Sequence, residues 1–521
     1  MPGQQNEQWG SRLAIIVAAV AMAVGTGNIW RFPRIAAEHG GGAFLIAVTV
    51  GVAIWAVPLL MSEFLMGTRS RLGNIGAFRD FMGRRFTWAG AFMVCVTAGI
   101  MFYYAVVVGW ALRYTGVAVT GGLTLEEGAD GGFGREHWDA FISSPIETVG
   151  FHAIAVVIAA AVVYRGIRGG LERVLKVALP ALLVILVILL VRAVTLDGAE
   201  EGLRALFVPD WPELRSAQLW LEAFTQVAWS TGAGWGMMMV YAVYARQRED
   251  IAVNSGIIAV SDILVGFLAA AIILATVFSM SAAAGVGAEA AIRAEGTDDQ
   301  NVGLTFIYMV DLLATMPGAS VLAPLFFLAL SLAGISSLIA MFELGVTNLI
   351  NLGMTRQRAA LAVGAAAFCL GLPSALSLAT FQNQDWVWGV GLLVSGLLTA
   401  TAMLRYGLGR ARREINETSD VHVGAWWSLF IALIPVVFVI IFGWWIYQSV
   451  TQFHPDTWWY PFETFSVGTI ALQWGAALAL SLLIGGILAK MIAAGPMSST
   501  ERERDDAQQS RERDDAQQSQ E

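Results

Sequence analysis

The sequence has few charged residues and almost no cysteine. Asp, Glu, Lys and Arg make up 14% of its 521 residues, whereas a soluble domain averages about 25%. The two cysteines, Cys95 and Cys369, both stand in apolar runs, so they provide neither a disulfide framework nor a metal-ligand cluster. A soluble chain of this composition could not bury its apolar surface, which excludes the soluble classes of protein.

Motifs of catalysis are also missing. The sequence contains no HExxH, no nucleophile elbow and no P-loop, which are the common marks of metalloproteases, hydrolases and nucleotide-binding enzymes. Its histidines are scattered rather than paired: His39, His137, His152, His422 and His454. We therefore expect a protein that is not an enzyme, with no organic cofactor and no nucleic-acid partner.

Apolar runs are what the sequence has in abundance. Hydrophobic residues make up 57% of the chain and the mean hydropathy is +0.64. Runs of about 20 residues, the length of a membrane-spanning helix, recur along almost the whole chain. This predicts an all-α polytopic membrane protein in a lipid bilayer, with about twelve transmembrane helices at 13–36, 42–67, 88–120, 149–165, 171–193, 217–245, 251–280, 321–350, 358–377, 384–406, 425–450 and 468–494.

Arginine is concentrated in alternate loops. The basic loops carry Arg69, Arg71, Arg79, Arg84 and Arg85; Arg165, Arg168, Arg173 and Lys176; Arg246 and Arg248; Arg356 and Arg358; and Arg410, Arg412 and Arg413. The intervening loops are acidic or neutral. Because basic loops stay in the cytoplasm, we expect a multi-pass plasma-membrane protein with both termini cytoplasmic.

Two predicted spans are interrupted by glycine. The first contains Gly25 and Gly27, and the sixth contains Gly232, Gly234 and Gly236. Glycine is costly inside a helix, and unwound backbone at mid-membrane is tolerated only where it is buried in protein or lines a wet cavity. Free carbonyls there can hold a cation, and free amides can hold a carboxylate. The alternative is close helix packing through small residues.

The two breaks occupy the same position in two sets of five spans, which indicates an inverted-repeat transporter. We expect a cytoplasmic N-terminus at 1–12, a first five-helix repeat at 13–193, a second, inverted repeat at 217–406, helices 11 and 12 at 425–494, and a cytoplasmic tail at 495–521. The tail repeats nine residues in tandem and has no apolar content, so we expect it to be disordered. The loop 283–318 is polar and then amphipathic, as expected of a helical lid over an outer vestibule.

The string from Gly25 to Pro33, followed by the string from Glu38 to Phe44, resembles the first-helix motif of the neurotransmitter:sodium symporters, a family that includes bacterial amino acid transporters. The resemblance extends over about residues 9–450. It implies sodium-coupled import of a small zwitterionic substrate by alternating access, with helices 1 and 6 unwound at mid-membrane. The oligomeric state is left open.

The resemblance implies a substrate site between the breaks. Tyr104 matches the tyrosine that binds the substrate carboxylate, and the amides of Thr26 and Gly27 match its cradle. The implied substrate-binding residues are Met22, Ala23, Gly25, Thr26, Gly27, Ile100, Tyr104, Trp229, Ser230, Gly232, Trp235, Ser337 and Met341. Without the family, Tyr104 would read equally well as a packed aromatic residue.

The resemblance also implies two sodium sites, built of the hard oxygen ligands that sodium prefers. Site 1 comprises Ala23, Asn28, Ser230 and Asp262, where Asp262 stands at a position that is usually Asn. Site 2 comprises Ala21, Val24, Ala333, Ser336 and Ser337. Serines in a membrane helix often bond their own backbone or a neighbouring helix instead.

Arg31 and Asp385 match the family's outer gate, and Glu63 matches a buried carboxylate of the second helix. The sequence departs from the family at two places. The inner-gate Arg and Asp positions match Asn6 and Asn351, so we expect a weaker or differently held inner closure. The chloride-site positions match Val48 and Gly266, which offer no hydroxyl.

These features favour a sodium-coupled, chloride-independent amino acid importer. Gly25 stands where monoamine carriers have Asp, so a substrate with its own carboxylate is favoured. The alternative is a sodium-coupled carrier of a betaine, taurine or γ-amino acid osmolyte, because Trp229 and Trp235 could cage a quaternary ammonium by cation–π attraction. A channel is the rival outside the transporters, and a gated midplane site argues against it.

Overall fold

The computed structural model describes residues 7–123, 132–246, 249–281, 287–293, 300–453 and 455–492. Within these ranges the chain is built of helices, with one isolated antiparallel bridge between Gly41 and Pro209. The expectation of an all-α fold is therefore confirmed. The predicted tail and Asn6 lie outside the described residues.

The described residues up to 246 form thirteen α-helices and four short 3-10 or π-helical turns. They are α1 Arg12–Ala23, α2 Thr26–Ile29, α3 Arg31–Glu38, α4 Gly42–Gly51, η1 Val52–Ala56, α5 Val57–Ser70, α6 Asn74–Met82, η2 Arg84–Phe86, α7 Thr87–Val119, α8 Phe133–Ile142, α9 Pro145–Tyr164, η3 Ile167–Leu171, α10 Glu172–Val194, α11 Ala199–Phe207, η4 Trp211–Arg215, α12 Ala217–Ser230 and α13 Met237–Val243.

The second half of the described chain continues in the same way. Its elements are α14 Ile251–Met280, α15 Ala288–Arg293, α16 Gln300–Gly303, η5 Leu304–Tyr308, α17 Met309–Thr315, α18 Ala319–Asn351, α19 Arg356–Leu376, α20 Leu378–Tyr406, α21 Leu408–Thr418, α22 Ala425–Gln448, η6 Ser449–Phe453 and α23 Val467–Met491. The loop 283–318 thus contains the expected short helices.

Ten continuous helical segments of the described chain are long and apolar enough to cross a membrane, and the bent pair formed by α1 and α2–α3 makes an eleventh, with a bend of 53°. The remaining predicted span, 217–245, is divided into α12 and α13, each shorter than a membrane crossing. The expectation that two of about twelve spans are unwound therefore agrees with the structure at the two glycine-rich segments. There the backbone leaves the helix, so neither span is one continuous rod.

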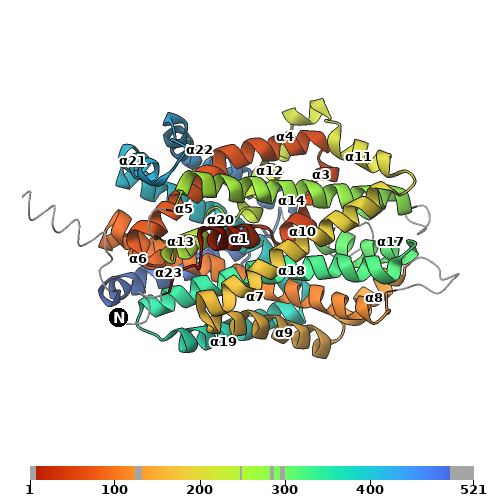
Figure 1. The fold of residues 1–521 in the computed structure, drawn as a ribbon, viewed down its shortest axis with the longest axis horizontal. Coiled ribbons are helices and arrows are strands. Elements are labelled where there is room, and N and C mark those ends of the chain that lie inside the picture. Colours follow the sequence, from red (N-terminus) through yellow and green to blue (C-terminus); the bar gives the residue numbers. More distant parts are fainter. Residues whose placement is uncertain are drawn as a thin grey trace, which may run out of the picture.

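The long helices run alongside one another, with α8, α11 and α17 at one end of the molecule and α6 and α21 at the other (Figure 1). α7 lies within the bundle and packs against α18, α9, α20 and α23. α14 begins where the Asp250 carboxylate accepts a hydrogen bond from the Val253 amide over 2.8 Å, a helix N-cap. This start fixes the register that brings Asp262 to mid-helix.

Candidate functional site

The first break separates α1 from α2 at Val24 and Gly25. The Gly25 amide donates to Asn28 Oδ1 over 3.0 Å, so the side chain of Asn28 satisfies a backbone group released from the helix. A Cβ at Gly25 would lie 2.7 Å from Ser337 Oγ and 3.2 Å from Tyr104 Oη. Only glycine allows α7 and α18 to approach this closely.

The second break, residues 231–236, connects α12 to α13. Gly232, Gly234 and Gly236 have φ angles of 72°, 93° and 78°, a left-handed region that glycine adopts without strain. The amides of Gly234 and Gly236 donate to Glu63 Oε1 over 2.9 and 3.0 Å. Glu63, fully buried on α5, thus binds backbone amides of the unwound segment.

A buried carboxylate links the two breaks. Asn28 Nδ2 donates to Asp262 Oδ1 over 2.8 Å and to the Asp262 carbonyl over 3.0 Å, and the Ser230 hydroxyl donates to Asp262 Oδ2 over 2.6 Å. Asp262 is 2% exposed, and within the described residues no Lys or Arg forms an ion pair with it. A buried carboxylate surrounded by neutral oxygen-bearing side chains is a fitting place for a cation.

The serine pair on α18 divides its contacts. The Ser337 hydroxyl donates to the Met22 carbonyl of α1 over 3.0 Å, whereas the Ser336 hydroxyl donates to the Ala333 carbonyl of its own helix over 2.8 Å. Both serines are buried. The structure therefore brings Ser337 against the first break, while Ser336 makes the local bond common for serine in membrane helices.

Tyr104, a residue of α7, contacts the start of α2 through its hydroxyl. Its hydroxyl accepts hydrogen bonds from the Thr26 amide over 3.2 Å and from the Thr26 hydroxyl over 3.1 Å. The phenol group of Tyr104 and the amides of the first turn of α2 therefore lie together. Such a group of donors can bind a carboxylate.

A narrow cavity lies between the breaks. Its volume is about 10 Å³, about the room of one water molecule, so a larger guest requires side chains to move. Of the thirteen expected substrate-binding residues, all but Thr26 and Ile100 line it; Asn28 and Met237 line it as well. The sequence analysis missed Met237, although its position directly after the glycine break was a usable signal.

Trp229 separates this cavity from a wider vestibule. Its ring meets Trp235 edge-on at a centroid distance of 6.1 Å, and it lines both the cavity and the vestibule. Arg31 and Asp385 both line the vestibule. The Arg31 guanidinium, however, donates to Glu222 Oε2 over 2.9 Å and to Gln226 Oε1 over 2.7 Å, so its ion-pair partner here lies on α12 rather than on α20.

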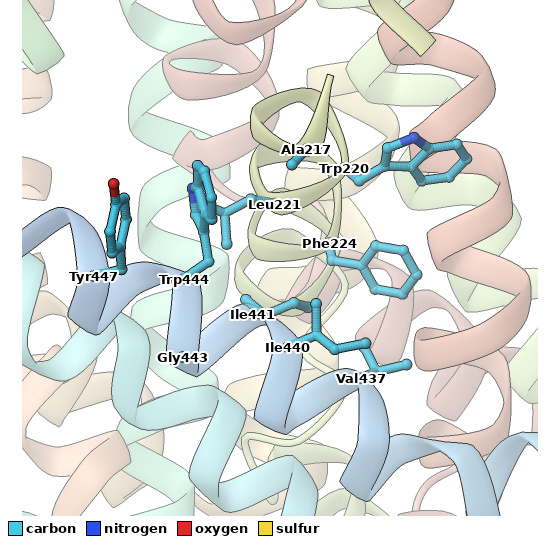
Figure 2. A pocket seen from close by; sticks show the side chains of 10 residues that line it. All are labelled: Ala217, Trp220, Leu221, Phe224, Val437, Ile440, Ile441, Gly443, Trp444 and Tyr447. Atoms are coloured by element: carbon cyan, nitrogen blue, oxygen red, sulfur yellow. The ribbon is translucent and has the colours of Figure 1, made fainter. Parts of the chain in front are cut away.

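A groove lies between α12 and α22 (Figure 2). This groove of about 520 Å³ is enclosed by apolar and aromatic side chains of α12 and α22, among them Trp220, Phe224, Ile441 and Trp444. α22 is largely exposed on the outside of the bundle. The groove carries no charged lining residue and is separate from the candidate site.

The other departures from the family pattern are also buried. Val48 is 2% exposed, and a Cβ at Gly266 would lie 3.0 Å from the ring of Phe32. Asn351, at the expected inner-gate position, accepts a hydrogen bond from the Gly73 amide over 2.7 Å. The side chain of Asn351 is thus held within the bundle.

Residues 6–132 and 142–492 match the sodium:neurotransmitter symporter family. A sodium-dependent transporter of Methanocaldococcus jannaschii, itself uncharacterized, is 29% identical over 457 residues, covering 85% of this chain and 90% of that protein. The sodium-dependent serotonin transporter of Drosophila melanogaster is 25% identical over 514 residues, covering 89% and 80%. The crystal structure of MhsT in complex with L-phenylalanine is similar with a TM-score of 0.73 and 28% identity, covering 84% of this chain and 99% of that one.

Proposed function

Because the chain belongs to the sodium:neurotransmitter symporter family, and is therefore a multi-pass, sodium-coupled symporter rather than an enzyme, we propose that it imports a neutral, apolar amino acid by alternating access. The observation that carries the proposal is the convergence of Asn28, Ser230, Asp262 and Tyr104 on two facing helix breaks. One break separates α1 from α2, and the other separates α12 from α13. The backbone of each break can therefore change conformation while the flanking helices stay intact.

The first sodium ion would bind among Asn28, Ser230, Asp262 and the Ala23 carbonyl. Asn28 Oδ1 and the carboxylate of Asp262 supply hard oxygen atoms, and the negative charge of Asp262 compensates the ion in a site without other fixed charge. Sodium would replace the hydrogen-bonding partners that Asp262 now has. This gives the ion a direct hold on both breaks.

The second sodium ion would bind between α1 and α18, at the carbonyls of Ala21, Val24 and Ala333 and the hydroxyls of Ser336 and Ser337. The contact of Ser337 with the Met22 carbonyl supports this placement, because it brings α18 against the first break. Ser336 would turn its hydroxyl away from the Ala333 carbonyl to reach an ion.

The substrate would place its carboxylate at Tyr104 and the amides of Thr26 and Gly27, close to the first sodium. Its side chain would extend toward Met22, Met237 and the two tryptophans. The polar groups there are already engaged, since the Ser337 hydroxyl donates to Met22 and the Trp235 indole donates to the Ala228 carbonyl over 2.9 Å. A charged side chain would find no partner, whereas flexible thioethers adapt to apolar side chains of different size.

The same geometry supports transport that does not need chloride. A sodium ion and a zwitterion in a site walled by hydrocarbon need fixed negative charge nearby. Asp262 supplies that charge from one helical turn before Gly266, on the same face of α14. Because a carboxylate can also take up a proton, a proton could enter as sodium leaves.

The basic loops support an orientation with both termini in the cytoplasm of a plasma-membrane protein. The vestibule bounded by Arg31, Glu222 and Asp385 would then face outward, and the end that carries the N-terminal segment would face inward. Residues 13–193 and 217–406 would act as the two inverted repeats that move against each other.

Uptake by reconstituted proteoliposomes tests the proposal. An inward sodium gradient should drive saturable accumulation of labelled leucine, methionine or phenylalanine, and replacing sodium with N-methylglucamine should abolish it. Replacing chloride with gluconate should leave uptake unchanged. Flux that neither saturates nor depends on sodium would favour the channel and refute the symporter.

The second candidate substrate class, a betaine, taurine or γ-amino acid, is favoured by the edge-on pair of Trp229 and Trp235, whose faces attract a quaternary ammonium. The same vesicles distinguish the classes. Sodium-driven uptake of betaine, taurine or γ-aminobutyrate without uptake of α-amino acids would replace the amino acid proposal by this one.

A further inference from the structure

The segment before α1 seals the end of the bundle opposite the vestibule. Trp9 is fully buried; its amide donates to the Tyr244 carbonyl over 3.1 Å and its indole donates to the Tyr241 carbonyl over 3.0 Å. Its ring lies edge-on to that of Tyr241. Trp9, just before α1, therefore packs on the end of α13 and ties together the two helices that run from the breaks to this end.

The residues beside Trp9 are tethered mainly through their backbone. Arg168 donates to the Gln8 carbonyl over 2.8 Å, and the Gly10 amide donates to Glu172 Oε2 over 2.7 Å. Arg246 donates to the carbonyls of Trp9 and Gly10. Within the described part of this segment, Glu7 is the residue whose side chain carries a charge into the bundle.

Glu7 forms an ion pair with Arg356, which also pairs with Glu343. Arg356 Nη2 donates to Glu7 Oε2 over 2.5 Å, while Nη1 donates to Glu343 Oε2 over 2.7 Å and Nη2 to Glu343 Oε1 over 3.0 Å. Arg356 also donates to the Tyr244 hydroxyl over 3.0 Å. The same arginine thus connects α18, α19, the end of α13 and the N-terminal segment.

The two carboxylates are not equivalent. The side chain of Glu343 is 0% exposed and chelates Arg356 through both oxygens, whereas that of Glu7 is 33% exposed and uses one oxygen. If Glu7 leaves, Arg356 keeps a buried, bidentate partner, and Glu7 moves into water. The departure of Glu7 therefore leaves no unpaired charge buried, which is the usual obstacle to opening a buried ion pair.

We propose that Glu7 is the latch of the inner closure: by binding Arg356 it holds Trp9 in place, and its release lets the N-terminal segment withdraw. In the family's inner gate, the Arg precedes the first helix and the Asp follows the eighth; here those positions match Asn6 and Asn351. The Glu7–Arg356 pair has the opposite order of charges. Arg356 is the fixed half and Glu7 the movable half. This inference rests on alternating access as proposed above, but its test needs neither substrate nor transport.

The test measures access to α1 from the inner side. Ala18 is fully buried and lies one helical turn before Met22 on the same face of α1, so a cysteine there reports opening. The variant background is Cys95→Ala, Cys369→Ala and Ala18→Cys, with an impermeant maleimide applied to the cytoplasmic face of inside-out vesicles. The matched control for Glu7→Ala is Gln8→Ala, because only the backbone of the exposed Gln8 is used.

Glu7→Ala should raise the labelling rate by about threefold to tenfold, the range expected when a partly exposed group loses a charge-assisted hydrogen bond. Gln8→Ala should not change it. Glu7→Asp, which keeps the carboxylate on a shorter arm, should give an intermediate rate and serves if the Ala variant is poorly produced. Equal labelling in Glu7→Ala and the background would overturn the latch.

Sodium separates this inference from the proposed function. If both are right, sodium should slow labelling in the background and in Glu7→Ala, because it favours the outward-facing state. A latch effect that persists while sodium changes nothing would support the latch and contradict sodium coupling through the breaks. An effect of sodium on labelling with no effect of Glu7→Ala would support sodium coupling through the breaks and contradict the latch.

Discussion

Asn28 and Asp262 meet across the interface between α2 and α14, where one amide nitrogen donates to both the carboxylate and the backbone carbonyl of the aspartate. Asn28 simultaneously accepts from the Gly25 amide. A single side chain therefore connects the first helix break to the buried charge of the seventh span. A cation bound at Asp262 would change the shape of the break directly.

Asp262→Asn should impair sodium-driven uptake, because it removes the fixed charge that compensates sodium while keeping the size of the side chain. Chloride should restore part of the activity, since an anion could then supply the missing charge. The measurement compares uptake in chloride and gluconate media for both proteins. Collapse of wild-type uptake in gluconate would contradict the role given to Asp262.

Tyr104→Phe should weaken substrate binding by about one to two decades, the equivalent of about 1.5–3 kcal/mol for a hydrogen bond to a charged group. The matched control is Tyr114→Phe: Tyr114 lies on the same helix and is equally buried but does not line the cavity. Equilibrium binding of labelled substrate in sodium measures both. An unchanged Kd in Tyr104→Phe would place the carboxylate elsewhere.

Ser336→Ala combined with Ser337→Ala should abolish sodium-driven uptake with near-normal folding, because it removes two of the oxygen ligands proposed for a second sodium ion. Ser331→Ala is the control, since its hydroxyl lies on the same helix but meets Thr115 at 2.8 Å. Uptake and its sodium dependence are measured for each variant. Full sodium-driven transport in the double variant would remove the second site from α18.

The spans and the breaks were predictable because their signals are local. The length of each apolar run predicts a membrane-spanning helix, and the glycines at 25, 232, 234 and 236 predict where the helix is interrupted. The start and end of α14 coincide with the predicted span 251–280. Asp262 was assigned to the site only through the resemblance to the family, and the structure brings it against Asn28 and Ser230.

What the sequence did not predict depends on side-chain direction and on conformational state. Arg31 can reach carboxylates on two helices, and only the packing decides that Glu222 holds it here. Met237 lines the cavity because it directly follows Gly236, whose left-handed conformation sets the direction in which α13 begins. Ser336 and Ser337 are adjacent in sequence but about 100° apart around the helix, so only one of them faces α1.

The two carboxylates near Arg31 predict opposite effects on substrate release. Glu222→Gln frees Arg31 to approach Asp385 and should slow the dissociation of bound substrate outward, whereas Asp385→Asn should hasten it. Because the Arg31–Glu222 pair is about one-fifth exposed, each change should be modest, about twofold to fivefold. Dissociation of labelled substrate in sodium measures both rates. Equal shifts in the same direction would refute an exchange of partners.

The inner closure should depend on pH through Glu7. Burial, together with the nearby charge of Glu343, raises the pKa of Glu7 above its ordinary value of 4.5 despite the opposing effect of Arg356. The titratable groups that face it are Arg356 on α19, Glu343 on α18 and Tyr244 at the end of α13. When the segment withdraws, Glu7 enters water and its pKa returns toward the ordinary value, so the closed state binds the proton more tightly.

The sign of the pH effect follows from this difference: a protonated carboxyl of Glu7 can still accept a hydrogen bond from Arg356 and costs less to bury than a carboxylate, so protonation strengthens the latch rather than releasing it. The proton's contribution to the closed state is complete below pH 4.5 and is lost as the pH rises through the raised pKa of Glu7. Labelling of the Ala18→Cys reporter should therefore be slowest in acid and should accelerate with rising pH, after correction for the reactivity of the thiol itself. Glu7→Gln should flatten the profile, because an amide can still accept from Arg356 but cannot titrate. A profile that is the same in Glu7→Gln and in the parent would assign the pH dependence to another group and leave Glu7 without a part in it.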